Sequence, residues 1–544
     1  MKKALALILA LVMTMALVAC GGGKTTTSTT TPGDSGSGTS SAPLQGTADL
    51  NKDKDVPVAT DPAVKYKEHV EIACTGLNTT LDPYQKTNNT HDMAFKLSHN
   101  QLVYYNYETA AFEPELAAEW KAEAGDTYWF KLKQGVKFQN GEELTSDDVL
   151  WTFVERPATM DAIGAATLVK MVKEVEIIND YEFRVKLKNP STDFIPTASL
   201  SYGAILNREA CKADPEGFKI GTGGWKLTEF VPNDHMSYEK YEDAWCWTEK
   251  QTPTKTLVLR MRADNTAASV SVQTGECAAA QAVGAAVYAS LKNDPSVRMA
   301  AYAAESLEYF YFNMKDGIAA DDVNLRKAIA YAISYEDQNL VRFDGDATRH
   351  YNIWGPKQPG YYETPDDLKV DYNLEKAKEY LAKSKQPNGC TINLTTSSTF
   401  ENQSALIMED LRKIGITVNV EVLDGTGFNA KMAEGTGYDM GVYNISLNPN
   451  GARFKFVADP SSSTNRAHYV NDAMLAKFNA ALAEADEAKR NEIYKEIQIE
   501  LAEDIPYVPI MTGVGYMLEN VNAGGTIWSA DNKHDFTYIW QIEK

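Results

Sequence analysis

The sequence predicts a mixed α/β protein with more than one domain. Residues 127–132 place apolar side chains at every second position, as a half-buried strand does, whereas residues 324–333 repeat them at helical spacing. The chain beyond its N-terminal signal-like and low-complexity stretch has roughly 485 residues, well above the ~250–300 at which one hydrophobic core usually splits. We therefore expect at least two α/β domains.

Strand patterns recur along this region. An apolar run at 71–76 predicts a buried strand, and residues 137–141 end a strand on an Asn-Gly turn, which favours a hairpin. Residues 175–187 alternate on both sides of a turn at Asn179 and Asp180. Further strands are expected at 256–262, 416–423, 507–511 and 515–519.

Helical patterns lie between these strands. Thr145 is placed to cap a helix that runs toward Arg156, with Asp147 and Asp148 in the first turn, where the helix dipole favours them. Apolar stripes predict further helices at 92–101, 324–333, 372–383, 405–414 and 477–502, the last as one or two helices.

The N-terminus has the features of an export signal. Lys2 and Lys3 precede 16 apolar residues at 4–19, fewer than the ~20 that a membrane-spanning helix needs. The segment ends in Leu17-Val18-Ala19-Cys20, with the small residues that a signal peptidase requires. This pattern resembles a bacterial lipobox, which implies a lipoprotein signal peptide at 1–20 and a lipid on Cys20.

The segment after Cys20 is dominated by Gly, Ser, Thr and Pro and shows no apolar periodicity. Such a composition cannot bury enough surface to offset chain entropy. We expect residues 21–65 to form a disordered tether between the anchor and the folded domains.

Composition excludes several classes of function. A net charge of −21 argues against a nucleic-acid partner, because phosphates are neutralised by clustered Lys and Arg. The seven His are scattered, and the sequence has neither a CxxC pair nor a GxSxG motif, so we expect no metal site, no cofactor and no enzyme activity. The chain has six Cys, and five remain when Cys20 is set aside, an odd number that does not fit a disulfide framework. Cys211 with Cys246 is the best candidate pair for a single disulfide.

A series of short motifs runs in a fixed order from residue 66 to 544. They include Leu81-Asp82-Pro83, 115–120 (ELAAEW), 137–141 (KFQNG), 145–149 (TSDDV), 221–227 (GTGGWKL), 411–418 (LRKIGITV), Tyr438-Asp439 and 505–509 (IPYVP). Together these motifs resemble the extracellular solute-binding proteins of family 5, the oligopeptide/dipeptide type.

The resemblance implies an α/β, two-lobe, periplasmic-binding-protein-like fold of type II. Lobe one would comprise residues 66–306, with an extra subdomain at about 90–205, and a C-terminal return at 506–544. Lobe two would comprise residues 307–505. Ligand would bind in the cleft between the lobes, which would close by a hinge motion.

The resemblance also points to ligand contacts. Peptide-binding members pair the strand after Tyr438-Asp439 with the peptide backbone and use a nearby Asp for the ligand ammonium. Counting forward from Tyr438-Asp439 puts Asn448 at the position of that Asp, and alignment on Pro449 puts Ile445 there. Residues 443–450 contain neither Asp nor Glu, so this segment offers the ligand no carboxylate. An amide can accept a hydrogen bond from an ammonium group but cannot neutralise it. The candidate ligand-binding residues are Tyr443, Asn444, Asn448, Phe428 and Trp354.

The expected function is a lipid-anchored, substrate-binding receptor of an ABC importer. It would be a monomer at the cell membrane, facing the extracellular or periplasmic side, and would deliver a peptide or other small polar solute to a permease and ATPase complex. Two alternatives stay open: a receptor for a non-peptide such as a glycan, and a surface sensor or structural protein that kept the fold without transport.

Overall fold

The computed structural model describes residues 64–77, 80–85, 89–106, 109, 111–248, 251–447, 451–462, 464–529 and 534–543. These residues belong to one compact unit of the chain. The expected signal peptide, Cys20 and the tether up to residue 63 lie outside the described residues. None of the described helices combines the length and the apolar character needed to cross a bilayer.

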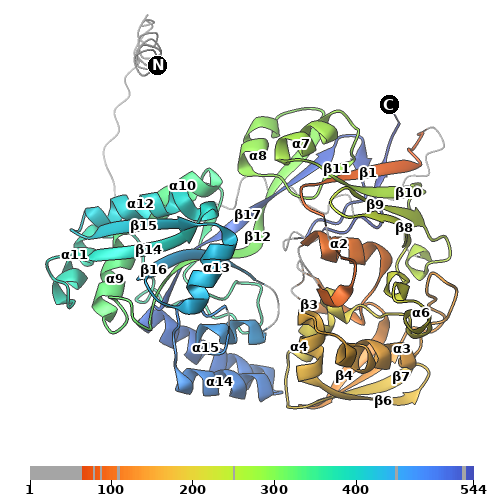
Figure 1. Ribbon diagram of the computed structural model, residues 1–544, viewed down its shortest axis with the longest axis horizontal. Helices are drawn as coiled ribbons and strands as arrows, with labels where there is room; N and C mark the ends of the chain where they lie inside the picture. Colours follow the sequence, from red (N-terminus) through yellow and green to blue (C-terminus); the bar gives the residue numbers. More distant parts are fainter. Residues whose placement is uncertain are drawn as a thin grey trace, which may run out of the picture. The chain divides into compact units, whose positions relative to one another are not determined.

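A long mixed sheet runs through the centre of the fold (Figure 1). Its strands, in spatial order, are β15 (Thr417–Leu423), β14 (Thr391–Ser397), β16 (Met440–Ser446), β12 (Val297–Phe312), β17 (Tyr507–Asn520), β11 (Ala279–Ala280), β1 (His69–Cys74), β10 (Thr256–Met261), β9 (His235–Lys240) and β8 (Trp225–Val231), with β13 (Thr348–Arg349) beside β17.

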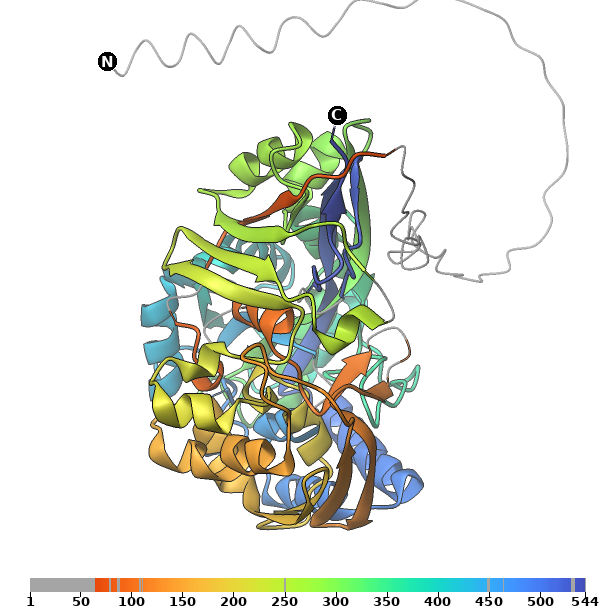
Figure 2. The ribbon, with the colours of Figure 1, turned by 90° about the vertical axis from the view of Figure 1, so that its right-hand side faces the viewer.

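Two long antiparallel strands, β12 and β17, join the two halves of this sheet, and Figure 2 shows them side by side. Residues 297–303 of β12 pair with 514–520 of β17, next to β11 and β1; residues 307–311 pair with 507–512, next to β16. The register shifts between Ala303 and Leu307, where the lobe boundary at 306/307 is expected. The same register shift falls between Thr512 and Val514 of β17, and the expected boundary at 505/506 stays a prediction.

The half of the sheet that contains β16 separates two hydrophobic cores. Side chains alternate across β12, so Leu307, Tyr309 and Tyr311 enter one core while Phe310 and Phe312 enter the other. The second core, around Phe310, is covered by α9 (Val323–Ala332), α10 (Tyr335–Phe343), α11 (Leu374–Lys383) and α12 (Glu401–Arg412). The core around Tyr309 is covered by α13 (Gly425–Glu434), α14 (Asp472–Ala483) and α15 (Glu487–Asp504).

The other half of the sheet packs against α2 (Asn89–Ser98), α7 (Asn265–Gln273) and α8 (Ala285–Leu291). A separate core, from Tyr84 to Leu206, packs against a four-stranded sheet within the segment where the sequence places a subdomain, a division that stays a prediction. This subdomain meets α14, because the Thr192 amide donates to the Leu482 carbonyl at 2.9 Å. Its elements are β4 (Ala117–Ala124), β5 (Thr127–Leu132), β6 (Val172–Asn179), β7 (Glu182–Leu187), α3 (Ser146–Leu150), α4 (Ile163–Met171) and α5 (Phe194–Ala198).

Further short strands and one short α-helix lie between these elements or after β17. They are β2 (Val103–Asn106), β3 (Ala111–Pro114), α6 (Arg208–Ala213), β18 (Ala523–Gly524) and β19 (Trp540–Gln541).

Most locally encoded elements occur where the sequence predicts them. The Asp148 carboxylate accepts the Thr145 amide at 3.0 Å, which fixes the start of α3 as expected. The helical pattern at 477–502 corresponds to two helices, α14 and α15. The strands expected at 507–511 and 515–519 are confirmed, but they form one continuous strand, β17, because Thr512 and Val514 also pair with Leu307 and Ala303. Cys211 and Cys246 are free thiols, so that candidate disulfide does not form.

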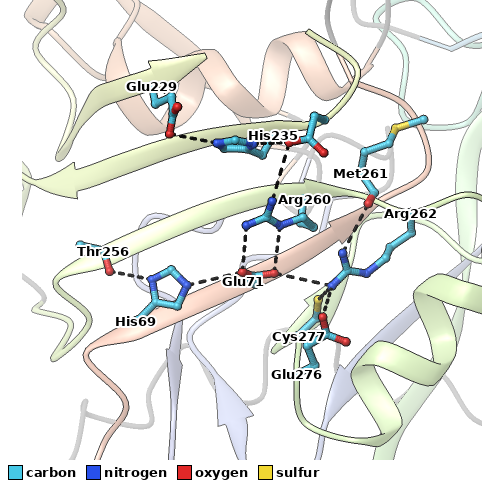
Figure 3. Close-up of polar contacts among 11 residues, drawn as sticks. His69, Glu71, Glu229, His235, Thr256, Arg260, Met261, Arg262, Glu276 and Cys277 are labelled. Atoms are coloured by element: carbon cyan, nitrogen blue, oxygen red, sulfur yellow. Dashed lines mark hydrogen bonds and ion pairs between the residues drawn. The ribbon is translucent and has the colours of Figure 1, made fainter. Parts of the chain in front are cut away.

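A charged cluster links β1, β8, β9 and β10 on the sheet surface (Figure 3). The Glu71 carboxylate accepts two hydrogen bonds from the Arg260 guanidinium, at 3.2 and 3.3 Å, and one of its oxygens lies 3.6 Å from a guanidinium nitrogen of Arg262. Burial acts to raise the pKa of Glu71, but hydrogen bonds and charge from Arg260, with a contribution from His69, outweigh it and lower the pKa. Hydrogen bonds from His235 to Glu229 and Asp234 raise the pKa of that imidazole.

We expect Glu71→Gln to cost about 1–2 kcal/mol of unfolding free energy at pH 7, because Arg260 and Arg262 lose their carboxylate. A carboxyl with a lowered folded-state pKa stabilises the protein above its unfolded pKa of about 4.3, and this stability is lost as the pH falls through the folded pKa. Urea unfolding at pH 7 and pH 3.5 should therefore show a difference between variant and wild type that shrinks at the lower pH.

Glu119→Gln is the control, because Glu119 belongs to an exposed pair with Lys131. If Glu71→Gln lowers the free energy of unfolding by the same amount at both pH values, the account is contradicted.

Candidate functional site

A cavity of about 430 Å³ lies beside the end of β16. Its volume falls within the range of roughly 300–1,000 Å³ that is usual for small-molecule sites. All its lining residues belong to the segment expected to form lobe two: Tyr309, Tyr443, Asn444, Ile445, Ser446, Lys455, Phe456, Asp459, Ser462, Thr464 and Arg466.

The cavity adjoins an open strand edge. β12 pairs with the whole of β16, from Met440 to Ser446. On the other side, β14 pairs with β16 only at Met440 and Gly441. Beyond Gly441, no strand in the described part of the chain covers that edge. The backbone of residues 442–446 is thus able to accept a further extended segment.

The Tyr443 ring in the cavity wall is supported from behind by a second aromatic ring. Tyr443 stacks on Phe428 of α13, with ring centroids 5.4 Å apart and planes within 9°. Phe428 is buried, and α13 is held at its start by Asp424, whose side chain accepts the Gly427 amide at 2.7 Å. Phe428 therefore supports the Tyr443 ring, and Tyr443 faces the cavity.

Charged and polar groups line the rest. One carboxylate oxygen of Asp459 accepts from the Ser461 amide at 2.9 Å and its hydroxyl at 2.7 Å, while Lys455 lies 3.9 Å from the other oxygen. Burial acts to raise the pKa of Asp459, but the Ser461 hydrogen bonds and Lys455 outweigh it and lower the pKa. Asp459 is therefore ionised at neutral pH.

The structure distributes the predicted site residues among different environments. Tyr443 and Asn444 line the cavity, and the Asn444 side chain donates to Ser306 at 3.3 Å. Asn448 lies outside the described residues. Trp354 is fully buried and stacks on Phe454 at 4.2 Å, so its place in the structure gives it a packing role. The ligand contacts themselves stay predictions.

Sequence reasoning missed the contribution of residues 455–466. This segment follows β16 and begins within a short 3-10 helix at Gly451–Val457, without the periodic pattern that marks a long element. One signal was present: Lys455 and Asp459 are four residues apart, the spacing of neighbours on a helical turn. Arg466 carried no comparable signal.

A larger and more open hollow, of about 770 Å³, includes Lys315, Arg326, His468 and Asp504 in its lining. Arg326 pairs with Asp504 at 2.5 Å and donates to the carbonyls of Ala319 and Ala320. Because the buried charge of Arg326 is already compensated by Asp504, this hollow is a less favourable candidate for a ligand site than the cavity beside β16. No cluster of potential metal ligands occurs among the described residues.

Comparison with known protein families decides the class of this fold and site. The family model for bacterial extracellular solute-binding proteins, family 5 (middle region) matches residues 111–466. The chain belongs to this family. The membership confirms the resemblance seen in the sequence motifs, and it makes the chain an extracellular solute-binding protein.

Curated relatives and solved structures agree with the assignment to family 5. Heme-binding protein A of Haemophilus influenzae is 24% identical over 77% of this chain and 82% of its own length. Di/tripeptide-binding protein 2 of Pseudomonas aeruginosa is 26% identical over 88% of this chain and 96% of its own. The crystal structure of the substrate-binding protein CtaP from Listeria monocytogenes superposes with a TM-score of 0.79 at 18% identity, covering 88% of this chain and all of that one, and confirms the two-lobe α/β fold.

Proposed function

We propose that this family 5 protein is a monomeric, lipid-anchored receptor that captures a peptide or another small polar solute and delivers it to the permease and ATPase of an ABC importer. Ligand binds at the cavity beside β16, on the lobe-two side of the expected cleft, and is released chemically unaltered. The protein works at the outer face of the cell membrane, held there by a lipid on Cys20.

The open edge of β16 beside the cavity is the observation that carries this proposal. An extended ligand backbone can hydrogen-bond to residues 442–446 as an added strand, while side chains of the ligand enter the cavity. The two curated relatives are named for heme and for di- and tripeptides, so family membership alone does not fix the ligand. The strand edge favours a peptide-like one.

Uptake by cells tests the receptor role. The solute that co-purifies with the protein is identified by mass spectrometry, and its labelled form is offered to cells with and without the gene. We expect deletion to abolish uptake and the restored gene to recover it. Unchanged uptake after deletion, or recovery of a chemically altered solute from the purified protein, would reject the proposal.

We expect Cys20→Ala to release the protein from the membrane, because each buried methylene of an acyl chain contributes about 0.8 kcal/mol to anchoring. The measurement is detergent-phase partitioning of cell fractions. Ser28→Ala, in the expected tether, is the control and should partition like the wild type. If Cys20→Ala stays in the detergent phase, the anchor lies elsewhere.

A further inference from the structure

Arg466 is a buried cation at the wall of the cavity beside β16. Its exposed fraction is 8%, and it belongs to the cavity lining. The guanidinium carbon lies 3.8 Å from the centroid of the Tyr443 ring and 5.5 Å from that of Phe428. The Arg466 side chain donates to the Asn429 side-chain oxygen at 3.3 Å.

Among the residues that the structure describes, no carboxylate acts as a counter-ion to Arg466. The other two buried arginines differ, since Arg156 pairs with Asp82 at 2.7 Å and Arg326 with Asp504 at 2.5 Å. A guanidinium has five N–H donors, and burial of an unpaired charge is costly. The aromatic contact offsets part of that cost, and one neutral amide supplies one acceptor.

The remaining charges of the cavity do not compensate Arg466. Lys455 and Asp459 face each other at 3.9 Å, and Asp459 is further occupied by Ser461. These two charges balance, so the cavity lining has a net charge of +1 from Arg466, although the chain as a whole carries −21. A bound anion would therefore neutralise the net positive charge of the cavity lining.

We propose that Arg466 is the anchor for a carboxylate of the ligand. The planar guanidinium can donate two parallel hydrogen bonds to the two oxygens of a carboxylate. Tyr443, Tyr309 and Phe456 line the same cavity and offer apolar surface to an adjoining aromatic or aliphatic group. The ligand class is thus a small organic acid with an apolar group, including short peptides with a free C-terminus. This inference rests on the proposed receptor function and specifies its ligand.

Calorimetry on the purified full chain tests the assignment. The probes are the dipeptide Ala-Phe, its C-terminal carboxamide, 3-phenylpropionate and phenyl phosphate. We expect the wild type to bind a carboxylate probe, and Ala-Phe about 100-fold more tightly than its carboxamide, the effect typical of losing one partner of a buried charge pair. Arg466→Gln should lower carboxylate affinity about 100-fold and leave carboxamide affinity within about 3-fold. The exposed Arg412→Gln, whose partner is Glu409, is the matched control and should behave as wild type.

Other outcomes overturn the carboxylate anchor. They are equal affinity for the dipeptide and its carboxamide, binding of phenyl phosphate alone, and binding of none of the probes. If Arg466→Gln does not fold, the ratio between acid and carboxamide in the wild type decides. Uptake by cells separates the two proposals. If uptake depends on the gene but shows no preference for the carboxylate form over the carboxamide, only the carboxylate anchor is rejected. If uptake does not depend on the gene, the receptor role is rejected.

Discussion

Replacing Trp354 by Ala is expected to lower the free energy of unfolding by about 3–5 kcal/mol, the range found when a large aromatic side chain is removed from a core. Trp354 is fully buried and packs between Phe454 and Phe478, with ring centroids at 4.2 and 5.8 Å. Truncation leaves a cavity that α14 and α15 cannot fill without moving.

Urea denaturation of the full chain measures this loss, and Trp354→Phe, which retains part of the stack, should lose less. The sequence suggested Trp354 as a ligand contact. A Trp354→Ala protein that keeps its stability but binds ligand more weakly would support that earlier suggestion and contradict the packing role.

Replacing Gly515 by Ala is expected to cost about 1–3 kcal/mol, as overpacking of a closely packed site does. Gly515 of β17 lies opposite Tyr302 of β12, and a Cβ added there would lie 2.3 Å from a carbon of the Tyr302 ring. Tyr302 is itself buried against His534, so the ring has little room to move.

Gly513→Ala provides a matched control two residues away on the same strand. A Cβ at Gly513 meets its nearest atom at 3.6 Å, an ordinary contact, so stability should stay within about 0.5 kcal/mol. Thermal and urea unfolding of both variants test the contrast. Equal effects at the two positions would contradict the described packing of β12 against β17.

The sequence predicts elements that are encoded by local pattern. The apolar alternation of β5 and the apolar stripe of α9 each specify their element without distant partners. The 16 residues of β12 were not foreseen, because they include Ala-rich and Glu-containing stretches that carry weak strand preference. Pairing with β17, some 200 residues later, makes them a strand, and a local pattern cannot reveal such a partner.

The residues of the candidate site also fall into those that the sequence could predict and those that it could not. Tyr443 and Asn444 could be placed from the family motif Tyr438-Asp439, because a strand keeps a fixed count from its motif. Arg466 and Asp459 could not, since they reach the cavity from an irregular segment whose path depends on tertiary packing. The net charge of the cavity, which specifies its ligand, therefore became visible only in the structure.

Hydrogen-exchange mass spectrometry, with and without the solute that co-purifies with the full chain, tests the central claim most directly. If the cavity beside β16 is the receptor site, bound solute should slow amide exchange in residues 442–447 and 455–466 and leave residues 315–326 unchanged. Slower exchange confined to the residues around Arg326 and Asp504, with none beside β16, would contradict this account and assign the ligand to the other hollow.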